Sequence, residues 1–190
     1  MTENPEALLT VRLGANATGF TGAPITTNIQ ENLFIGGFSF SWEDYLTFSA
    51  DEVKTFVFDG TACSCAQITF EPLTFSADSG PITIDFYAGV TANSDGTLLG
   101  ASNRRATSSN VTDAEFRLNP TGVSLGTRFA GDFVPSTGTG VGNTSGSASN
   151  PALPFEIDKD LKYAFVVTNK NGADTTVQIK STWFEIPAGF

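Results

Sequence analysis

The feature that most constrains the fold is the stretch 161–186, in which apolar and polar residues alternate in two runs separated by a turn signal. Residues two apart on an extended strand share one face, so each run predicts a strand with an apolar face and a wet face. The predicted core-facing residues are Leu161, Tyr163, Phe165 and Val167 in the first run, and Val177, Ile179 and Trp183 in the second. Between the runs, Asn171-Gly172 is a dipeptide typical of tight hairpin turns. The stretch therefore predicts a β-hairpin that covers a core.

The remainder of the chain continues the strand rhythm, at spacings near ten residues. Expected strands cover 53–60, 66–70, 82–89, 114–118, 122–133 and 153–157, with turn clusters at Gly60 and at 76–81. Ile82, Ile84, Phe86, Phe116 and Leu118 are expected to face inward, and Val123, Leu125 and Phe129 alternate along their strand. A Gly/Ser-rich segment, 135–150, is expected to be a long loop. These features predict an all-β chain, specifically an antiparallel β-sandwich of jelly-roll type.

The first part of the chain differs in pattern from the rest. Residues 1–32 are rich in Thr, Asn, Gly and Pro and are interpreted as an extended N-terminal arm, with a loose terminus as the alternative. Residues 33–190 are then the sandwich domain, and the density of aromatic residues in 33–48 predicts burial there. Residues 49–52 resemble a helix capping box, but the β-branched and aromatic run that follows favours a strand.

Charge composition bears on the class of partner. The formal net charge is −10, with only 10 Lys and Arg among 190 residues. Binding to a nucleic-acid backbone or to an anionic membrane surface depends on clustered cations, so neither partner is expected. The sequence has no apolar run of the length that spans a bilayer. The N-terminus MTENPEALLT lacks a basic region, so it is not expected to be a secretory signal.

Catalytic chemistry has few candidates. The chain has 0 His, which removes the commonest general base and metal ligand. Cys63 and Cys65 are its only cysteines, and they are interpreted as reduced thiols because a bond between them would close a very small ring. The carboxylates lie in no motif that singles out a catalytic pair. A non-enzymatic protein without a cofactor is expected, with a calcium ion between acidic loops as the alternative.

Two groups of residues are candidates for contacts with other molecules. Arg104-Arg105 is the only adjacent basic pair, and it fits either a solvated loop or a contact with an acidic or carbonyl-rich surface. The arm contains more apolar residues than a fully solvated tail needs, and these residues could become ordered on a partner by adding a strand to one of its sheets. These are Leu8, Leu9, Val11, Leu13, Phe20 and Ile25.

Two segments carry a resemblance to a known family. Segment 82–105 contains an F-x-x-G … G-T-x-L … N-R pattern, and segment 155–186 contains a Y-x-x-x-V-T-N … G pattern that ends in W-x-E. The matching residues are Phe86, Gly89, Gly96, Thr97, Leu99, Asn103, Arg104, Tyr163, Val167, Thr168, Asn169, Gly172, Trp183 and Glu185. From about Val53 onward the chain resembles the capsid decoration, or cement, proteins of tailed bacteriophages, which have a jelly-roll-like body.

The resemblance implies a non-enzymatic structural protein of the virion. Such a protein is made in the host cytoplasm, binds the major capsid protein on the outer surface of an icosahedral head, and stabilises the shell. It also implies a homo-oligomer, either a trimer or a dimer. The alternative is a carbohydrate- or receptor-binding β-sandwich module of a virion, for which an exposed Trp42 would be the natural stacking residue.

Overall fold

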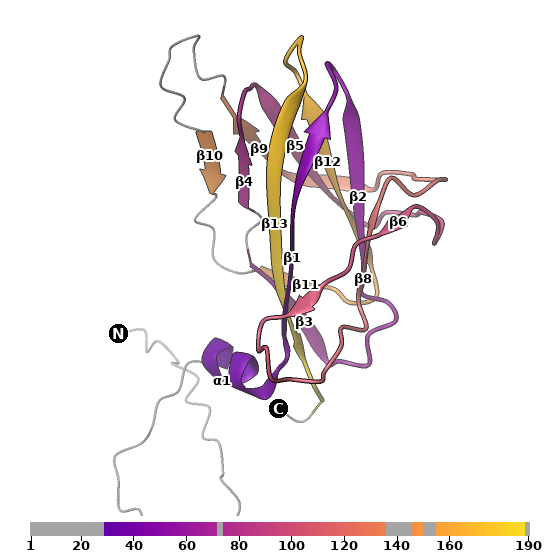
Figure 1. The fold of residues 1–190 in the computed structure, drawn as a ribbon. Coiled ribbons are helices and arrows are strands. Elements are labelled where there is room, and N and C mark those ends of the chain that lie inside the picture. Colours follow the sequence, from indigo (N-terminus) through magenta and orange to yellow (C-terminus); the bar gives the residue numbers. More distant parts are fainter. Residues whose placement is uncertain (1–28, 72–73, 136–145, 150–154, 189–190) are drawn as a thin grey trace, which may run out of the picture.

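A computed structural model describes residues 29–71, 74–135, 146–149 and 155–188. Within these residues, two antiparallel sheets pack face to face, and a single helix, α1 (Ile29–Gly36), lies at one end of the sandwich (Figure 1). The predicted antiparallel β-sandwich is therefore confirmed.

Each sheet combines strands that are distant in the sequence. The six-stranded sheet has the order β6 (Thr97–Leu98), β8 (Glu115–Leu118), β2 (Val53–Asp59), β12 (Lys162–Asn169), β5 (Ile82–Ala88) and β9 (Thr127–Val134). The seven-stranded sheet has the order β10 (Gly146–Ser149), β4 (Thr74–Ala77), β13 (Thr175–Ile186), β1 (Ser39–Phe48) and β7 (Ser102–Asn103). Its other two strands are β3 (Gln67–Phe70), which pairs with β13 beyond β4, and β11 (Phe155–Ile157), which pairs with β3.

The core between the sheets is built mainly from aromatic rings. Trp183 of β13 is fully buried, and its ring lies 5.4 Å from that of Phe58 and 6.0 Å from that of Phe70. Phe116 of β8 stacks on Phe56 at 5.8 Å and meets Trp42 edge to face at 5.3 Å. Such offset and T-shaped pairs add to the hydrophobic stabilisation that comes from burial. The aromatic density of 33–48 thus results in burial of Phe40, Trp42 and Phe48, as predicted.

The predicted hairpin over 161–186 is wrong, although both of its strands exist. Within the described residues β12 pairs with β2 and β5, whereas β13 pairs with β1, β3 and β4, so the two strands belong to opposite sheets. The connection is an arch across the core, and Gly172 does not adopt the positive φ of a type I′ turn. Asn169 holds the arch: its side-chain amide donates to the carbonyls of Ser49 and Ala173, both at 2.9 Å. Leu161 precedes β12 and is 40% exposed, so it is not a core residue.

Other boundaries also differ from the sequence predictions. Helix α1 was not predicted, and it crosses the expected border at 32/33 between arm and sandwich. The predicted strand over 122–133 begins only at Thr127, at β9, which ends the order of the six-stranded sheet. Leu125, which precedes β9, and Phe129 are both exposed. Strand β4 enters the expected turn cluster at 76–81, and β10 lies within the expected loop 135–150.

The turn before β2 explains why a capping-box sequence starts no helix. The backbone N–H of Ser49 donates to the Glu52 carboxylate at 2.8 Å, and the N–H of Glu52 donates to the Ser49 carbonyl at 3.1 Å. Both bonds resemble those of a helix start, but Asp51 has a φ of 59°, which is incompatible with a continuing right-handed helix. Strand β2 follows at once, as predicted.

Candidate functional site

Helix α1 is fastened to the end of the sandwich where several sequence-predicted residues meet. Leu33 is its buried anchor. The helix ends in a Schellman motif: Gly37, at a φ of 75°, donates its N–H to the Phe34 carbonyl, and Phe38 donates to the Leu33 carbonyl at 2.8 Å. A Cβ on Gly37 would lie 2.2 Å from the Ser108 hydroxyl. The loop that carries Ser108 can therefore come this close to the helix end only because residue 37 is a glycine.

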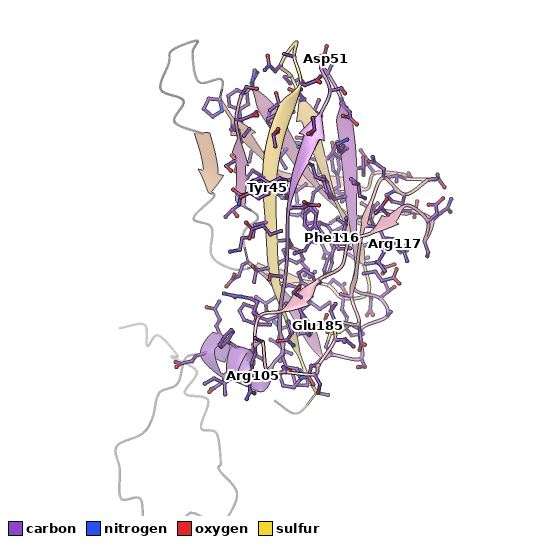
Figure 2. All side chains as sticks on the ribbon, viewed as in Figure 1. Tyr45, Asp51, Arg105, Phe116, Arg117 and Glu185 are labelled. Carbon is purple, nitrogen blue, oxygen red and sulfur yellow. A yellow bond between two sulfur atoms is a disulfide. The ribbon has the colours of Figure 1, made fainter. Side chains whose placement is uncertain are left out.

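The predicted contact residues Arg104 and Arg105 bind this helix within the same chain. The Arg105 guanidinium donates to the carbonyl of Ile35, and its Nε donates to the Thr107 hydroxyl at 3.2 Å. Arg104 lies 3.7 Å from the Glu71 carboxylate and 5.9 Å from the centre of the Phe34 ring. Cations at a helix C-terminus are favourable because the last carbonyls carry partial negative charge. The carbonyl-rich surface that suits these residues is thus the end of α1, shown beside the Arg105 label in Figure 2.

Two asparagines secure the loop 103–114 to the same helix end. The amide of Asn103 donates to the carbonyls of Gly37 at 2.8 Å and Asn110 at 3.1 Å. The amide of Asn110 donates to Gly36 at 3.3 Å and to Gly37 at 3.2 Å. Most carbonyls at a helix end need partners from outside the helix, and this loop supplies them.

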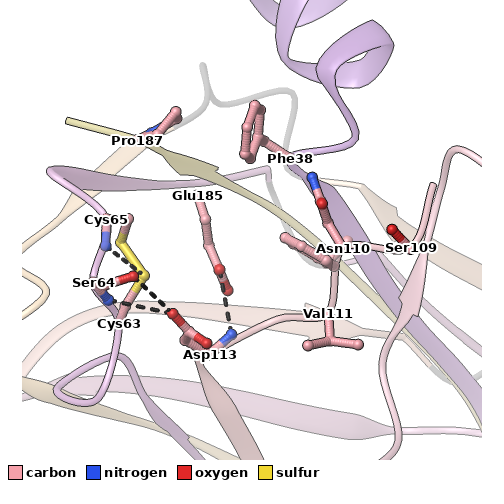
Figure 3. Close-up of a pocket in the computed structure, with 11 residues that line it drawn as sticks. Phe38, Cys63, Ser64, Cys65, Ser109, Asn110, Val111, Asp113, Glu185 and Pro187 are labelled. Carbon is pink, nitrogen blue, oxygen red and sulfur yellow. Dashed lines mark hydrogen bonds between the residues drawn. A yellow bond between two sulfur atoms is a disulfide. The ribbon is translucent and has the colours of Figure 1, made fainter. Parts of the chain in front are cut away.

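Beside this loop lies a pocket of about 340 Å³ (Figure 3). One wall is the Cys63–Ser64–Cys65 turn and the opposite wall is formed by Asn110 and Val111. Phe38 and Pro187 line its apolar part, whereas Asp113 and Glu185 supply two carboxylates. We refer to it below as the α1-end pocket.

Glu185 is a buried hydrogen-bond acceptor at this end of the sandwich. Its residue surface is only 6% exposed, and its carboxylate accepts hydrogen bonds from four donors. The Trp183 indole Nε1 donates at 3.2 Å, the backbone N–H groups of Asp113 and Ala114 each donate at 3.3 Å, and the Thr112 hydroxyl also donates. These neutral donors compensate part of the solvation that the carboxylate loses on burial.

The oxidation state of the two cysteines differs from the one predicted from the sequence. Cys63 and Cys65 form a disulfide, so the prediction of reduced thiols is wrong. Their Cα atoms are 5.2 Å apart, within the ordinary range for a disulfide, because the turn brings the two residues closer than an extended strand would. Ser64 lies between them and donates to the Asp113 carboxylate, from its hydroxyl at 3.0 Å and from its backbone N–H at 3.4 Å. The disulfide turn and the loop 103–114 are thus joined across the pocket.

The described residues contain no group of three or more His, Cys, Asp or Glu side chains that could hold a metal ion. Within the same residues, no helix is long and apolar enough to cross a bilayer. The arm residues Leu8, Leu9, Val11, Leu13, Phe20 and Ile25 lie outside the described part of the chain.

The structure also places the residues relevant to ligand stacking. Trp42 and Trp183 are both buried, so neither can stack on a sugar. Tyr45 is 65% exposed on the outer face of the seven-stranded sheet (Figure 2). Next to it, the Gln178 amide donates to the Glu43 carboxylate at 2.6 Å, and the Ser76 hydroxyl donates to Gln178 at 2.9 Å. This polar row around one aromatic ring was not predicted from the sequence.

Comparisons of the chain with protein-family models, with curated proteins and with solved structures found no match.

Proposed function

We propose that this protein is a capsid decoration protein that binds the outer surface of a tailed-bacteriophage head and stabilises the shell. The observation that carries the proposal is the resemblance of segments 82–105 and 155–186 to that family, in the order and spacing of their turn and core residues. An antiparallel β-sandwich body is compatible with it.

The positions of the motif residues support treating the two segments as one unit. From the first segment, Asn103 donates to the Gly37 carbonyl at the end of α1, and Arg104 lies over the Phe34 ring of that helix. From the second segment, Glu185 accepts from Thr112 and Ala114 of the same loop and also from the Trp183 indole. The two segments are distant in sequence but meet at one end of the sandwich. The other motif residues of the second segment, Asn169 and Gly172, lie in the arch between β12 and β13.

The disulfide is also compatible with an external position on a particle. Disulfides persist in oxidising surroundings, including virion surfaces, and are uncommon in proteins that remain in a reducing cytoplasm. A decoration protein made in the host cytoplasm would meet such surroundings after release. Its proposed partners are the major capsid protein and further copies of itself, as a trimer or dimer.

The test compares purified shells with and without the protein. Electron microscopy of decorated shells is expected to show added density on the outer surface, and decorated shells should survive heating or osmotic shock that opens bare shells. A ligand that binds only the assembled state stabilises that state by mass action. Equal resistance of decorated and bare shells, with no added density, would refute the proposal.

A carbohydrate- or receptor-binding module remains the second candidate, and Tyr45 is the observation that favours it. An exposed ring flanked by amide and carboxylate groups on a sheet face is a plausible platform for a sugar ring. A glycan array probed with the protein and with Tyr45→Ala decides this candidate. Binding that the substitution abolishes would support it, whereas an absence of binding by the unaltered protein would refute it.

A further inference from the structure

The α1-end pocket carries two carboxylates that no cation neutralises. Glu185 and Asp113 both line it, and in the described part of the chain neither forms an ion pair. Their partners are hydroxyl, indole and backbone donors, all of them neutral. Asp113 is exposed, but Glu185 is buried, and a buried negative charge is costly unless a cation completes the arrangement. A cationic group is therefore the ligand chemistry that the pocket lacks.

The rim of the pocket is apolar, which sets a second requirement for a ligand. Val111 is 80% exposed, the most exposed of the large hydrophobic side chains in the described residues. Pro187 and Phe38 line the same pocket from the other side (Figure 3). On helix α1, beside this loop, Ile35 is 53% exposed. A ligand that fits both features is a segment in which one cation is flanked by apolar residues.

The chain itself contains such a segment. Residues 8–13 read LLTVRL, and Arg12 is the only Lys or Arg among residues 1–28. An arginine suits the site because its fork of N–H donors matches carboxylate oxygens. In an extended segment Leu8 and Arg12 share one face, so an arginine directed at the carboxylates would bring an apolar residue to the rim.

The segment is also tethered close to the pocket. Helix α1 has eight residues, about 12 Å of rise, and its C-terminal end lies beside the pocket. The sixteen peptide bonds from Leu13 to Ile29 could span up to about 50 Å if extended, several times the length of the helix. A short tether of this kind gives an effective concentration in the millimolar range.

We propose that residues 8–13 dock in the α1-end pocket of the same chain, with the Arg12 guanidinium against the carboxylates of Glu185 and Asp113. This inference does not depend on the proposed function. It assigns to the first residues of the chain an intramolecular binding site, whether or not the protein decorates a shell.

Cross-linking of the full-length chain tests the proposal. Leu13→Cys is combined with Val111→Cys at the rim, or with Leu98→Cys as the matched control, because Leu98 is 55% exposed on β6 in the other sheet. A short bismaleimide joins the two introduced thiols and leaves the native disulfide intact. The rim pair is expected to give at least about fivefold more intramolecular product than the control pair. Equal yields, or a product that runs as a cross-linked dimer, would overturn docking within one chain.

Charge variants separate a specific contact from simple proximity. Arg12→Glu in the rim pair should lower the yield about fivefold, Arg12→Lys should keep most of it, and Glu6→Gln should leave it unchanged. Both positions, Arg12 and Glu6, precede the described residues, so each change leaves every described residue of the sandwich unaltered. A yield that is insensitive to Arg12→Glu would refute the ion pair.

Discussion

Replacing Glu185 by Ala should destabilise the sandwich strongly, although it removes only one side chain at its end. The carboxylate accepts bonds from four donors, and two of them, the Trp183 indole N–H and the Ala114 backbone N–H, are buried. Each buried donor left without an acceptor costs about 1–3 kcal/mol. The other two donors lie beside the pocket, where water can replace the carboxylate.

The expected loss in free energy of unfolding is about 2–4 kcal/mol, since relief of the desolvated charge offsets part of the cost. Glu185→Gln keeps one acceptor oxygen and should cost less, about 1–2 kcal/mol. The matched control is Glu115→Ala, because Glu115 is 41% exposed in its ion pair with Arg117 and such pairs contribute below about 1 kcal/mol. A typical domain has only about 5–15 kcal/mol of stability, so the three variants should be well separated.

Urea unfolding followed by tryptophan fluorescence measures the effect, because both Trp42 and Trp183 are buried. The midpoints should fall in the order wild type, Glu115→Ala, Glu185→Gln and Glu185→Ala, with unchanged slopes. A Glu185→Ala variant within about 0.5 kcal/mol of wild type would refute the claim that this carboxylate satisfies buried donors.

Three further outcomes are expected. Arg105→Ala should speed amide hydrogen exchange in α1 while β12 stays protected, because it removes the donor to Ile35 at the helix end; equal exchange would show that the contact is dispensable. Burial opposes ionisation of Asp59, but hydrogen bonds from Lys162 and Thr61 leave its pKa lowered. Ionised Asp59 therefore stabilises the fold fully above pH 3.8, and this contribution is lost as the pH falls through the lowered pKa. Asp59→Asn should melt at a lower temperature than the wild type, and the difference in melting temperature should shrink as the pH falls through that range. A difference that stays constant with pH would contradict this. The sequence alone suggested instead that the arm binds a partner. On that hypothesis a chain beginning at Asn28, which keeps α1, should keep the circular dichroism of the full protein but lose self-association or shell binding, and unchanged light scattering and shell pull-down would contradict it.

The sequence predicted individual strands well because strand patterning is local. The runs at β5 and β12 alternate within seven or eight residues, and that alternation identified both the strand and an inward face that includes Ile82, Ile84, Phe165 and Val167. Sheet membership is different, since it depends on partners far along the chain. Because β12 and β13 are neighbours in the sequence, they were predicted to pair as a hairpin. In the structure, the first ten residues of β13 pair with β1, which lies more than a hundred residues earlier. Nothing in the arch sequence reveals that choice.

The site was predicted only in fragments, for a related reason. Alternation from Val177 through Trp183 places Glu185 on the core face, so a buried carboxylate was foreseeable. Its donors were not, since nothing in the sequence of 106–114 indicates that Thr112 and Ala114 lie against Glu185. The disulfide escaped prediction because sequence separation alone does not determine the Cα–Cα distance. That distance is set by the turn, which also places Ser64 against Asp113.

Several of the residues that carry the family resemblance act within the chain. Asn103 fastens a loop to α1, Asn169 closes the arch, and Trp183 and Glu185 tie the loop to the core. Since a sandwich of this connectivity needs these roles whatever it binds, the resemblance bears on the body and leaves the binding surface to exposed residues. Substitutions at the motif residues should therefore lower stability and binding together, because binding requires the folded body. Substitutions at Val111 or Tyr45, which are mostly exposed, should change binding alone. A surface residue of that second kind is what would distinguish a shell-binding protein from a glycan-binding one.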